Sequence, residues 1–302
     1  MSVIPAPEMS DPLPPLDALA SQRLCVKTSR AGQPWLHNEV ASRMAQRLDL
    51  IRHPVHHWVH WAPRLGGLAS QDLLEQAFPQ ARCSVVQNEV ADVLWASRAL
   101  QQAWWKKWVR PARRFGLTPS EPADMLWSNM GLHMQANPAQ WMKQWASSLN
   151  QAGFVMFSCL GPDSLRELRQ LYASLDWPAP SHEFTDMHDW GDMLLSAGFA
   201  APIMDMERIT LTYETPAALL EELRSLGRNL NPQRFTACRG RAWRQQLHQL
   251  LQQHLASPAH GGRLALSFEV IYGHAFKAPT RLAVKPETQV SLAQMKAQLK
   301  RG

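Results

Sequence analysis

The stretch GFVMFSCLGPDSLRELRQLY, Gly153–Tyr172, carries the clearest indication of the fold. Its first part, Phe154–Leu160, is a short and nearly continuous apolar run, which is typical of a strand buried on both faces of a parallel sheet. Gly161 and Pro162 end the run, and leucines at helical spacing follow Asp163, which can cap a helix. A strand, a tight turn and a helix place a polar loop at the carboxyl end of a strand, where open α/β sheets bind their ligands.

Segments of alternating type lie on both sides of this stretch. A chain in which strands and helices alternate folds into a doubly wound α/β sheet whose strands are mostly parallel. Pro63–Gly67 is predicted as a turn, and Asn150–Gly153 as the end of the helix before the central strand. Two long strand patterns that bracket helices close the chain, which predicts a terminal antiparallel strand pair at one edge. The predicted strands are His56–Ala62, Cys83–Gln87, Pro122–Asn129, Met204–Glu214 and Arg263–Lys277, and predicted helices include Leu68–Phe78, Pro138–Leu149, Thr185–Ala197 and Pro216–Leu226.

Composition shifts divide the chain into three parts. Residues 1–33 begin with a proline-rich segment and are predicted to be disordered or extended. Residues 34–280 form the predicted α/β domain, with a basic helical insertion at about 216–260, and residues 281–302 form a tail.

Bulk properties are those of a soluble globular protein. Of the 302 residues, 45% are hydrophobic and 19% are charged. No apolar run approaches the roughly 20 residues that span a bilayer. The N-terminus lacks the basic region and apolar core of a signal peptide. We therefore expect a cytoplasmic protein without a membrane partner. Four scattered cysteines without a C-x-x-C pair indicate neither a zinc site nor a disulfide framework. The net charge of +6 suggests an acidic partner.

Several long segments together resemble one enzyme family. In order along the chain, these segments are His37–Ile51, Ala123–Met134, Phe157–Arg169, Phe184–Thr215 and Phe268–Lys277. They resemble class I S-adenosylmethionine-dependent methyltransferases and, more narrowly, the malonyl-acyl-carrier-protein O-methyltransferases of biotin synthesis. The resemblance covers roughly residues 35–280. It implies a seven-stranded Rossmann-like sheet, S-adenosylmethionine as the cofactor, and methyl transfer to a carboxylate, such as malonyl on an acyl carrier protein as partner.

The loop after the first strand departs from the family's pattern. The family binds the methyl donor with a glycine-rich loop of the type LDLGCGTG, whose small residues let backbone amides approach the ligand. The acid of that motif falls on Trp61, its first glycine on Pro63 and its second on Leu65, whereas Gly67, with Gly66 beside it, is kept. The changes remove several kcal/mol of donor binding, because each such contact contributes about 1–3 kcal/mol.

The candidate cofactor-binding residues lie at the ends of predicted strands. The family's ribose-binding acid falls near Gln87-Asn88-Glu89, where Gln87 can hydrogen-bond a hydroxyl. The resemblance and these positions predict cofactor contacts from Gly66, Gly67, Gln87 and Asn129, while catalytic residues are not assigned. Other polar residues at strand ends either flank a ligand or are ordinary strand-end residues, namely Ser128, His133, Ser158, Cys159, Gly161 and Asp163.

Two groups of possible metal ligands have simpler interpretations. The histidines at positions 53, 56, 57 and 60 surround Pro54, which argues against a shared helical face, and no acid or cysteine completes the set. A strand with paired or exposed imidazoles is therefore favoured, and no metal is predicted. Asp186 and Asp189 flank His188 at the start of a predicted helix, where acidic residues cap the helix.

The segment Gln101–Phe115 interleaves tryptophans with lysines and arginines between residues 104 and 114. It is interpreted as an amphipathic surface segment, as a docking site for an acidic acyl carrier protein, or as a nucleic-acid site, the last being less favoured. Two further functions stay open beside the methyltransferase. One is a non-catalytic protein of the same fold that binds an acidic partner, and the other is a methyltransferase with an altered pocket for a different small molecule.

Overall fold

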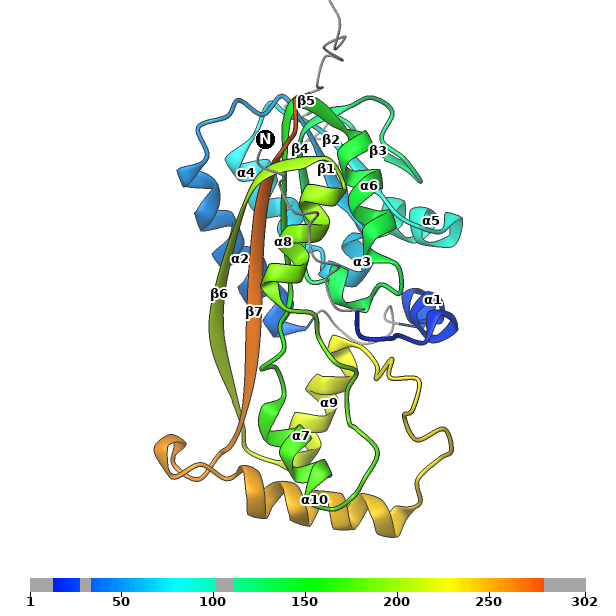
Figure 1. The fold of residues 1–302 in the computed structure, drawn as a ribbon, viewed down its shortest axis with the longest axis vertical. Coiled ribbons are helices and arrows are strands. Elements are labelled where there is room, and N and C mark those ends of the chain that lie inside the picture. The colour runs from blue at the N-terminus through cyan, green and yellow to red at the C-terminus, as the bar shows by residue number, and fades with distance from the viewer. Residues whose placement is uncertain (1–12, 28–33, 102–110, 280–302) are drawn as a thin grey trace, which may run out of the picture.

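A seven-stranded sheet with the strand order β3-β2-β1-β4-β5-β7-β6 forms the centre of the molecule (Figure 1). The structure is a computed structural model that describes residues 13–27, 34–101 and 111–279. Strands β1 to β5 pair in parallel, while β7 runs antiparallel to both β5 and β6. The predicted α/β fold with a terminal antiparallel pair is confirmed. The strands are β1 (His57–Trp61), β2 (Arg82–Val86), β3 (Arg113–Gly116), β4 (Ala123–Ser128), β5 (Leu149–Leu160), β6 (Phe199–Tyr213) and β7 (Leu264–Lys277).

Helices cover both faces of this sheet. One apolar cluster joins α2 and α4 to one face, and a second cluster joins α6 and α8 to the other. Within β1, Trp58 belongs to the first cluster, while Val59 and Trp61 belong to the second, which is the alternation expected of a strand buried on both faces. The helices around the sheet are α2 (Trp35–Gln46), continued by a 3-10 turn at Arg47–Leu50, α3 (Pro63–Gly66), α4 (Ala69–Ala77), α5 (Val90–Ala99), α6 (Pro138–Ser148) and α8 (Met187–Ser196).

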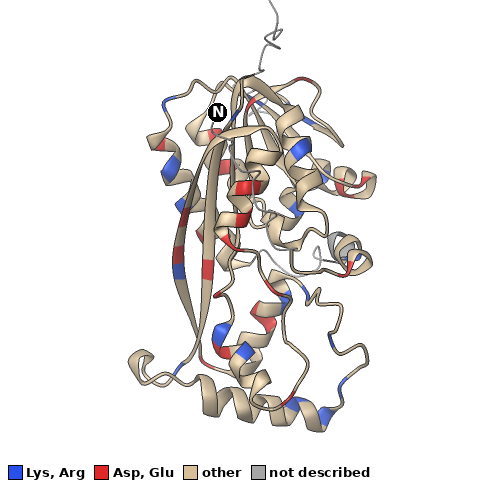
Figure 2. Cartoon of the chain, viewed as in Figure 1, with Lys and Arg blue, Asp and Glu red and all other residues tan. Residues whose placement is uncertain are grey.

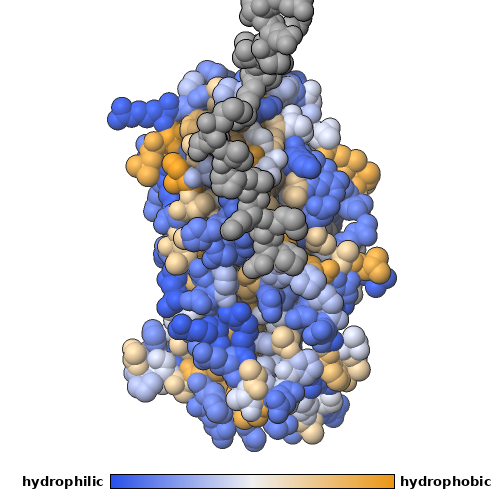
Figure 3. Space-filling model, viewed as in Figure 1, coloured by the Kyte–Doolittle hydropathy of each residue, from blue (hydrophilic) through white to orange (hydrophobic). Residues whose placement is uncertain are grey.

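The remaining helices lie beyond the carboxyl ends of the parallel strands (Figure 1). Helix α7 (Arg166–Ala173) follows β5. The insertion between β6 and β7 contains α9 (Pro216–Leu226), α10 (Arg241–Leu255) and a 3-10 turn at Pro258–His260, as the sequence predicts. Hydrophilic residues cover most of the face in Figure 3, and its hydrophobic residues form small, separate groups. Among the described residues, no helix is long and apolar enough to cross a membrane.

Three local predictions are wrong. The helix before the central strand ends at Ser148, and β5 begins at once, so residues 150–153 belong to the strand. Gly153 fits there because a Cβ would lie 2.8 Å from the Ala123 carbonyl oxygen, at the irregular start of the β4 pairing. Pro63–Gly66 is a short helix rather than a turn. In the N-terminal segment, α1 (Ala18–Lys27) is helical rather than extended, and Asp17 accepts a hydrogen bond from its Ala20 amide.

Most of the tryptophan-rich segment between 104 and 114 lies outside the described residues. Its last part forms edge strand β3, which the sequence does not predict. There Arg113 forms a buried ion pair with Glu75 at 2.6 Å, and Arg114 contacts Ser120 and Glu121. Both arginines therefore have partners within the fold.

Candidate functional site

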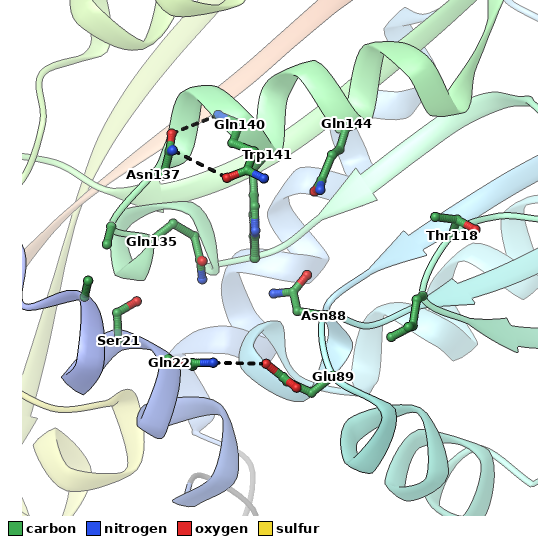
Figure 4. A pocket seen from close by; sticks show the side chains of 13 residues that line it. Ser21, Gln22, Asn88, Glu89, Thr118, Gln135, Asn137, Gln140, Trp141 and Gln144 are labelled. Carbon is green, nitrogen blue, oxygen red and sulfur yellow. Dashed lines mark hydrogen bonds between the residues drawn. The ribbon is translucent and has the colours of Figure 1, made fainter.

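A cavity of about 440 Å³ lies at the carboxyl ends of β2, β3 and β4, next to the point between β1 and β4 where the strand order reverses (Figure 4). Open α/β sheets bind ligands at this reversal. Amide side chains dominate its lining, and among the described lining residues only Glu89 is ionisable, so the cavity suits a neutral ligand that makes many hydrogen bonds. Its lining residues are Asn88 and Glu89 after β2, Leu117 and Thr118 after β3, Gln135, Ala136, Asn137, Gln140, Trp141 and Gln144 after β4, and Ala18, Ser21 and Gln22 of α1.

Helix α1 closes one side of this cavity. The Ser21 hydroxyl donates to the Met134 carbonyl oxygen at 2.5 Å, and the Gln22 amide donates to Glu89 at 3.4 Å (Figure 4). At the start of the helix, Asp17 forms an ion pair with Arg234 at 2.7 Å, and its amide donates to the Leu230 carbonyl oxygen at 2.9 Å. The wall that α1 provides is thus anchored both to the end of β4 and to the insertion.

In the loop after β1, the backbone amides donate hydrogen bonds to carbonyl oxygens of the same loop. Ala62 has a φ of 49°, which turns the chain sharply into α3. The amides of Leu65 and Gly66 donate to the Ala62 carbonyl oxygen at 3.0 and 3.2 Å, and the Gly67 amide donates to Pro63 at 2.9 Å. Pro63 has no amide hydrogen. In a glycine-rich loop such amides face a bound ligand, whereas here a helical turn satisfies them.

Trp61 stands at the position of the family's acidic residue and is buried against α6. Its ring meets Trp141 edge-on at 5.9 Å and Trp145 at 6.4 Å between centroids. Among the described residues, its indole nitrogen has no hydrogen-bond partner, and the same is true of the side-chain nitrogen of Gln87 at the end of β2. Buried donors are normally paired, but the indole nitrogens of four other buried tryptophans also lack a partner among the described residues, so these two groups alone do not mark a ligand site.

Gly66 and Asn129, which the sequence predicts at one site, are in direct contact. The Asn129 side-chain amide donates to the carbonyl oxygens of His37 at 3.0 Å and Gly66 at 2.5 Å, and its oxygen accepts from the Ser158 hydroxyl at 2.8 Å. A Cβ on Gly66 would lie 2.1 Å from the Asn129 backbone oxygen, so only glycine allows this approach. The contacts hold together the loops after β1 and β4. Gly67 follows with a φ of 89°, which favours glycine.

A buried ion pair that sequence reasoning missed supports the same loop. Arg64 of α3 pairs with Asp92 of α5, and their side chains are 7% and 3% exposed. The Arg64 guanidinium also lies over the Trp95 ring, 5.3 Å from its centroid. Burial raises the pKa of Asp92, which Arg64 opposes. The two residues are far apart in sequence, and no spacing pattern could have paired them.

A second cavity of about 90 Å³ lies between the end of β5, α7 and the end of α9. Its lining is mostly apolar, and the buried Ser181 hydroxyl beside it has no hydrogen-bond partner among the described residues. Arg228 lines it too, is exposed, and has no acidic partner in the described part of the chain. The other lining residues are Met134, Leu160, Leu165, Leu168, Pro180, His182, Phe184, Leu223, Leu226, Gly227, Asn229 and Phe268.

Two buried histidines connect the segments around the second cavity. His182 Nε2 donates to the His133 carbonyl oxygen at 3.2 Å, so its Nδ1 accepts from the Leu230 amide at 3.4 Å. His133 Nδ1 accepts from the Leu160 amide at 3.3 Å. Burial lowers the pKa of His182 to about 4 and the pKa of His133 well below its usual value, so both imidazoles are neutral at pH 7.

The loop after β5, which follows the stretch that indicates the fold, is engaged in internal contacts. The Asp163 carboxylate pairs with Arg208 at 2.7 Å, and its amide donates to Glu269 at 2.5 Å. Gly161 lies against the Glu269 side chain, and burial raises the pKa of the Cys159 thiol. These strand-end residues stabilise the β5–β7 connection.

The histidines of the first strand have partners within the protein. His57 contacts the Ser84 hydroxyl at 2.9 Å and the Pro122 carbonyl oxygen at 3.2 Å, and His60 contacts the Gln71 oxygen at 2.9 Å. These contacts fit the predicted strand with paired imidazoles. The predicted cap of α8 is confirmed, because Asp186 accepts from the His188 amide at 2.8 Å. The described residues hold no cluster of three metal-ligating side chains.

Relatives of this chain share one enzyme name. No family model matches the chain. A malonyl-[acyl-carrier protein] O-methyltransferase of Laribacter hongkongensis is 36% identical over 82% of this chain and 84% of its own length. One of Gallionella capsiferriformans is 32% identical over 82% of this chain and 86% of its own length. Among solved structures, the YcgJ protein of Bacillus subtilis superposes with a TM-score of 0.52 and 15% identity over 80% of this chain and 99% of its own, which shows the fold alone. The resemblance read from the sequence is confirmed, and the chain belongs to the malonyl-[acyl-carrier protein] O-methyltransferase family.

Proposed function

We propose that this protein is an S-adenosylmethionine-dependent methyltransferase that methylates a carboxylate carried by an acyl carrier protein. One observation supports this assignment beyond family membership. The segment Met134–Ala136 separates two cavities of different character, since Met134 lines the small apolar cavity and Gln135 lines the large amide-rich cavity. A methyl transfer needs such a pair of neighbouring sites, because donor and acceptor must be aligned in one complex.

The large cavity is proposed to hold the nucleoside half of the donor. Glu89, which lines the cavity, offers an acceptor to ribose hydroxyls, and the amide side chains of α6 can bond a base. When bound, the donor supplies a methyl group on a sulfonium. Gly66, Gly67, Gln87 and Asn129 are not among the described residues that line this cavity, and their contacts with the cofactor stay predictions. The amides of α3 are satisfied internally, so this loop contributes less to the amino-acid half than a glycine-rich loop does.

The small cavity is proposed to hold the acceptor. Its apolar walls would remove water from a carboxylate, which makes the carboxylate a better nucleophile. Arg228 at the rim and the unpartnered Ser181 hydroxyl can orient the carboxylate oxygens. A carboxylate is already ionised at pH 7, so these residues need only position it, and no general base is required.

A non-catalytic partner-binding protein is the second candidate function. The observation in its favour is the helical turn that satisfies the amides of Leu65, Gly66 and Gly67. The relatives are named as methyltransferases, which favours the first proposal.

Calorimetry with S-adenosylmethionine and S-adenosylhomocysteine tests the proposed donor site. We expect binding of both, and about tenfold weaker binding in Glu89→Ala, because the change removes a charge-assisted hydrogen bond worth about 1.5 kcal/mol. Glu221→Ala is the matched control, because Glu221 is exposed on α9 and outside the cavity. Absence of binding at millimolar ligand, together with no methyl transfer to a malonyl thioester, would leave the non-catalytic candidate.

A further inference from the structure

The part of the insertion that follows α9 is basic and contains no acidic residue. From Arg228 to Gly262 the sequence contains no Asp or Glu. Figure 2 shows blue segments along the connection from α9 to α10 and at the start of α10. An uninterrupted stretch of one charge on a folded surface attracts partners of the opposite charge. The arginines of this stretch are Arg228, Arg234, Arg239, Arg241 and Arg244.

Most of these arginines are available to a partner. Among them, only Arg234 forms an ion pair with a described residue, Asp17. Arg228, Arg241 and Arg244 are exposed and have no acidic partner in the described part of the chain. They form, with Arg239 and Phe235, what we call the arginine surface.

An aromatic platform lies within the arginine surface. The Arg239 guanidinium lies 4.0 Å from the centroid of Phe235 and 4.3 Å from that of Trp243. Phe235 is 47% exposed. Arginine and aromatic side chains together are typical of the energetically important centre of a protein interface.

The arginine surface ends at the mouth of the small cavity. Gly227, Arg228 and Asn229 line that cavity, and Arg228 belongs to both features. A partner that docks on α10 and the preceding loop would therefore hold its acyl group next to the cavity. By contrast, Arg113 and Arg114 of the tryptophan-rich segment have partners within the fold.

We infer that the arginine surface is the docking site of an acidic acyl carrier protein, which delivers its acyl group to the cavity beside Arg228. This inference rests on the proposed function and assigns the partner's place on the molecule. The carrier is the occupant favoured here because the surface is cationic, carries an aromatic platform and adjoins a small apolar cavity. That cavity, of about 90 Å³, is small and mostly apolar, which suits a short acyl group.

The test measures binding of the full-length chain to a purified acyl carrier protein by biolayer interferometry at 50 and 300 mM salt. The variant Arg241→Glu/Arg244→Glu reverses two charges in the first turn of α10, where a helix N-terminus favours acidic residues and the fold should persist. The control Arg52→Glu/Arg98→Glu changes the net charge equally at exposed positions elsewhere. We expect about tenfold weaker binding for the α10 variant, mainly through slower association, and wild-type binding for the control.

Each outcome decides the inference. Salt-sensitive binding that only the α10 variant loses supports it. Equal binding of the α10 variant and the wild type, or no carrier binding by the wild type, overturns it, as does equal loss in the control. Preferential binding of single-stranded DNA through the same arginines also overturns it, in favour of a nucleic-acid partner. Donor calorimetry and methyl transfer to a small malonyl thioester need no carrier protein. A failure of the proposed function is therefore distinguished from a failure of the docking inference.

Discussion

Replacing Asn129 by alanine tests whether this residue holds two loops together or serves a ligand. The substitution removes the two bonds to the His37 and Gly66 carbonyl oxygens and the one from the Ser158 hydroxyl, all in the buried interior. A net loss of about 1 kcal/mol for each hydrogen bond lowers the free energy of unfolding by about 3 kcal/mol in total. The loss is larger if no water fills the space left by the side chain. A domain is stable by only about 5–15 kcal/mol, so this loss is a large fraction.

Urea denaturation of the ligand-free protein, followed by circular dichroism, measures this loss. We expect the free energy of unfolding to fall by about 3 kcal/mol with an unchanged dependence on urea. Asn88→Ala is the control, because Asn88 is exposed and has no hydrogen-bond partner among the described residues, so its effect should stay within about 0.5 kcal/mol. A change below about 1 kcal/mol in Asn129→Ala, combined with weaker donor binding, would refute the structural role and make Asn129 a ligand residue.

Three further predictions concern stability. Gly66→Ala should lower the melting temperature strongly, because the new Cβ would lie 2.1 Å from the Asn129 oxygen, whereas Gly240→Ala should not, since nothing lies within 4 Å. Arg64→Met leaves the Asp92 carboxylate buried without its cation, so the free energy of unfolding measured in urea should fall by about 3–5 kcal/mol. An additional Asp92→Leu change should recover part of this loss. No recovery in the double variant would contradict the ion-pair argument. Acid should destabilise the fold, because buried histidines have a folded pKa below the unfolded value of 6.5. The unfolded chain then binds more protons, so stability is complete above pH 6.5 and declines as the pH falls toward 4, by up to about 3 kcal/mol for each residue. A flat stability profile between pH 7 and 4.5 would contradict this. The histidines whose pKa burial lowers to about 4 are His37, His60 and His182.

The sheet could be predicted from the sequence because its signals are local. The apolar run of β5 reflects burial on both faces of the sheet, because each apolar side chain from Phe154 to Leu160 enters one of the two apolar layers. The antiparallel pair followed from two long strand patterns around an insertion. The helical α3 was missed because Pro63–Gly67 has the composition of a turn, and its helical turn depends on the contact between Gly66 and Asn129.

The candidate site could be predicted only at the level of strand ends. Gln87 directly follows β2 and precedes the lining residues Asn88 and Glu89, and Gly66 contacts Asn129, but none of these three predicted residues lines the large cavity. Their roles in cofactor binding stay predictions. The contribution of α1 could not be predicted, since a short helix is marginal alone and this one depends on contacts with Met134 and Arg234. The pairing of Arg64 with Asp92 likewise depends on the folded arrangement of α3 and α5.

Helix α1 has a thermodynamic consequence for any ligand of the large cavity. The helix provides part of the cavity wall, and its contacts with described residues include the bonds of Asp17 and Ser21 and the packing of Ala20 against Met134 and Leu230. If docking of α1 on the cavity strengthens ligand binding, then ligand binding strengthens the docking of α1. The two changes in free energy are equal, because linkage between two binding events is reciprocal. Asp17, which directly precedes α1, and Ser21 within the helix thus set part of the ligand's affinity. Through Arg234 the same balance extends to the insertion, so occupancy of the cavity and the state of the insertion are coupled.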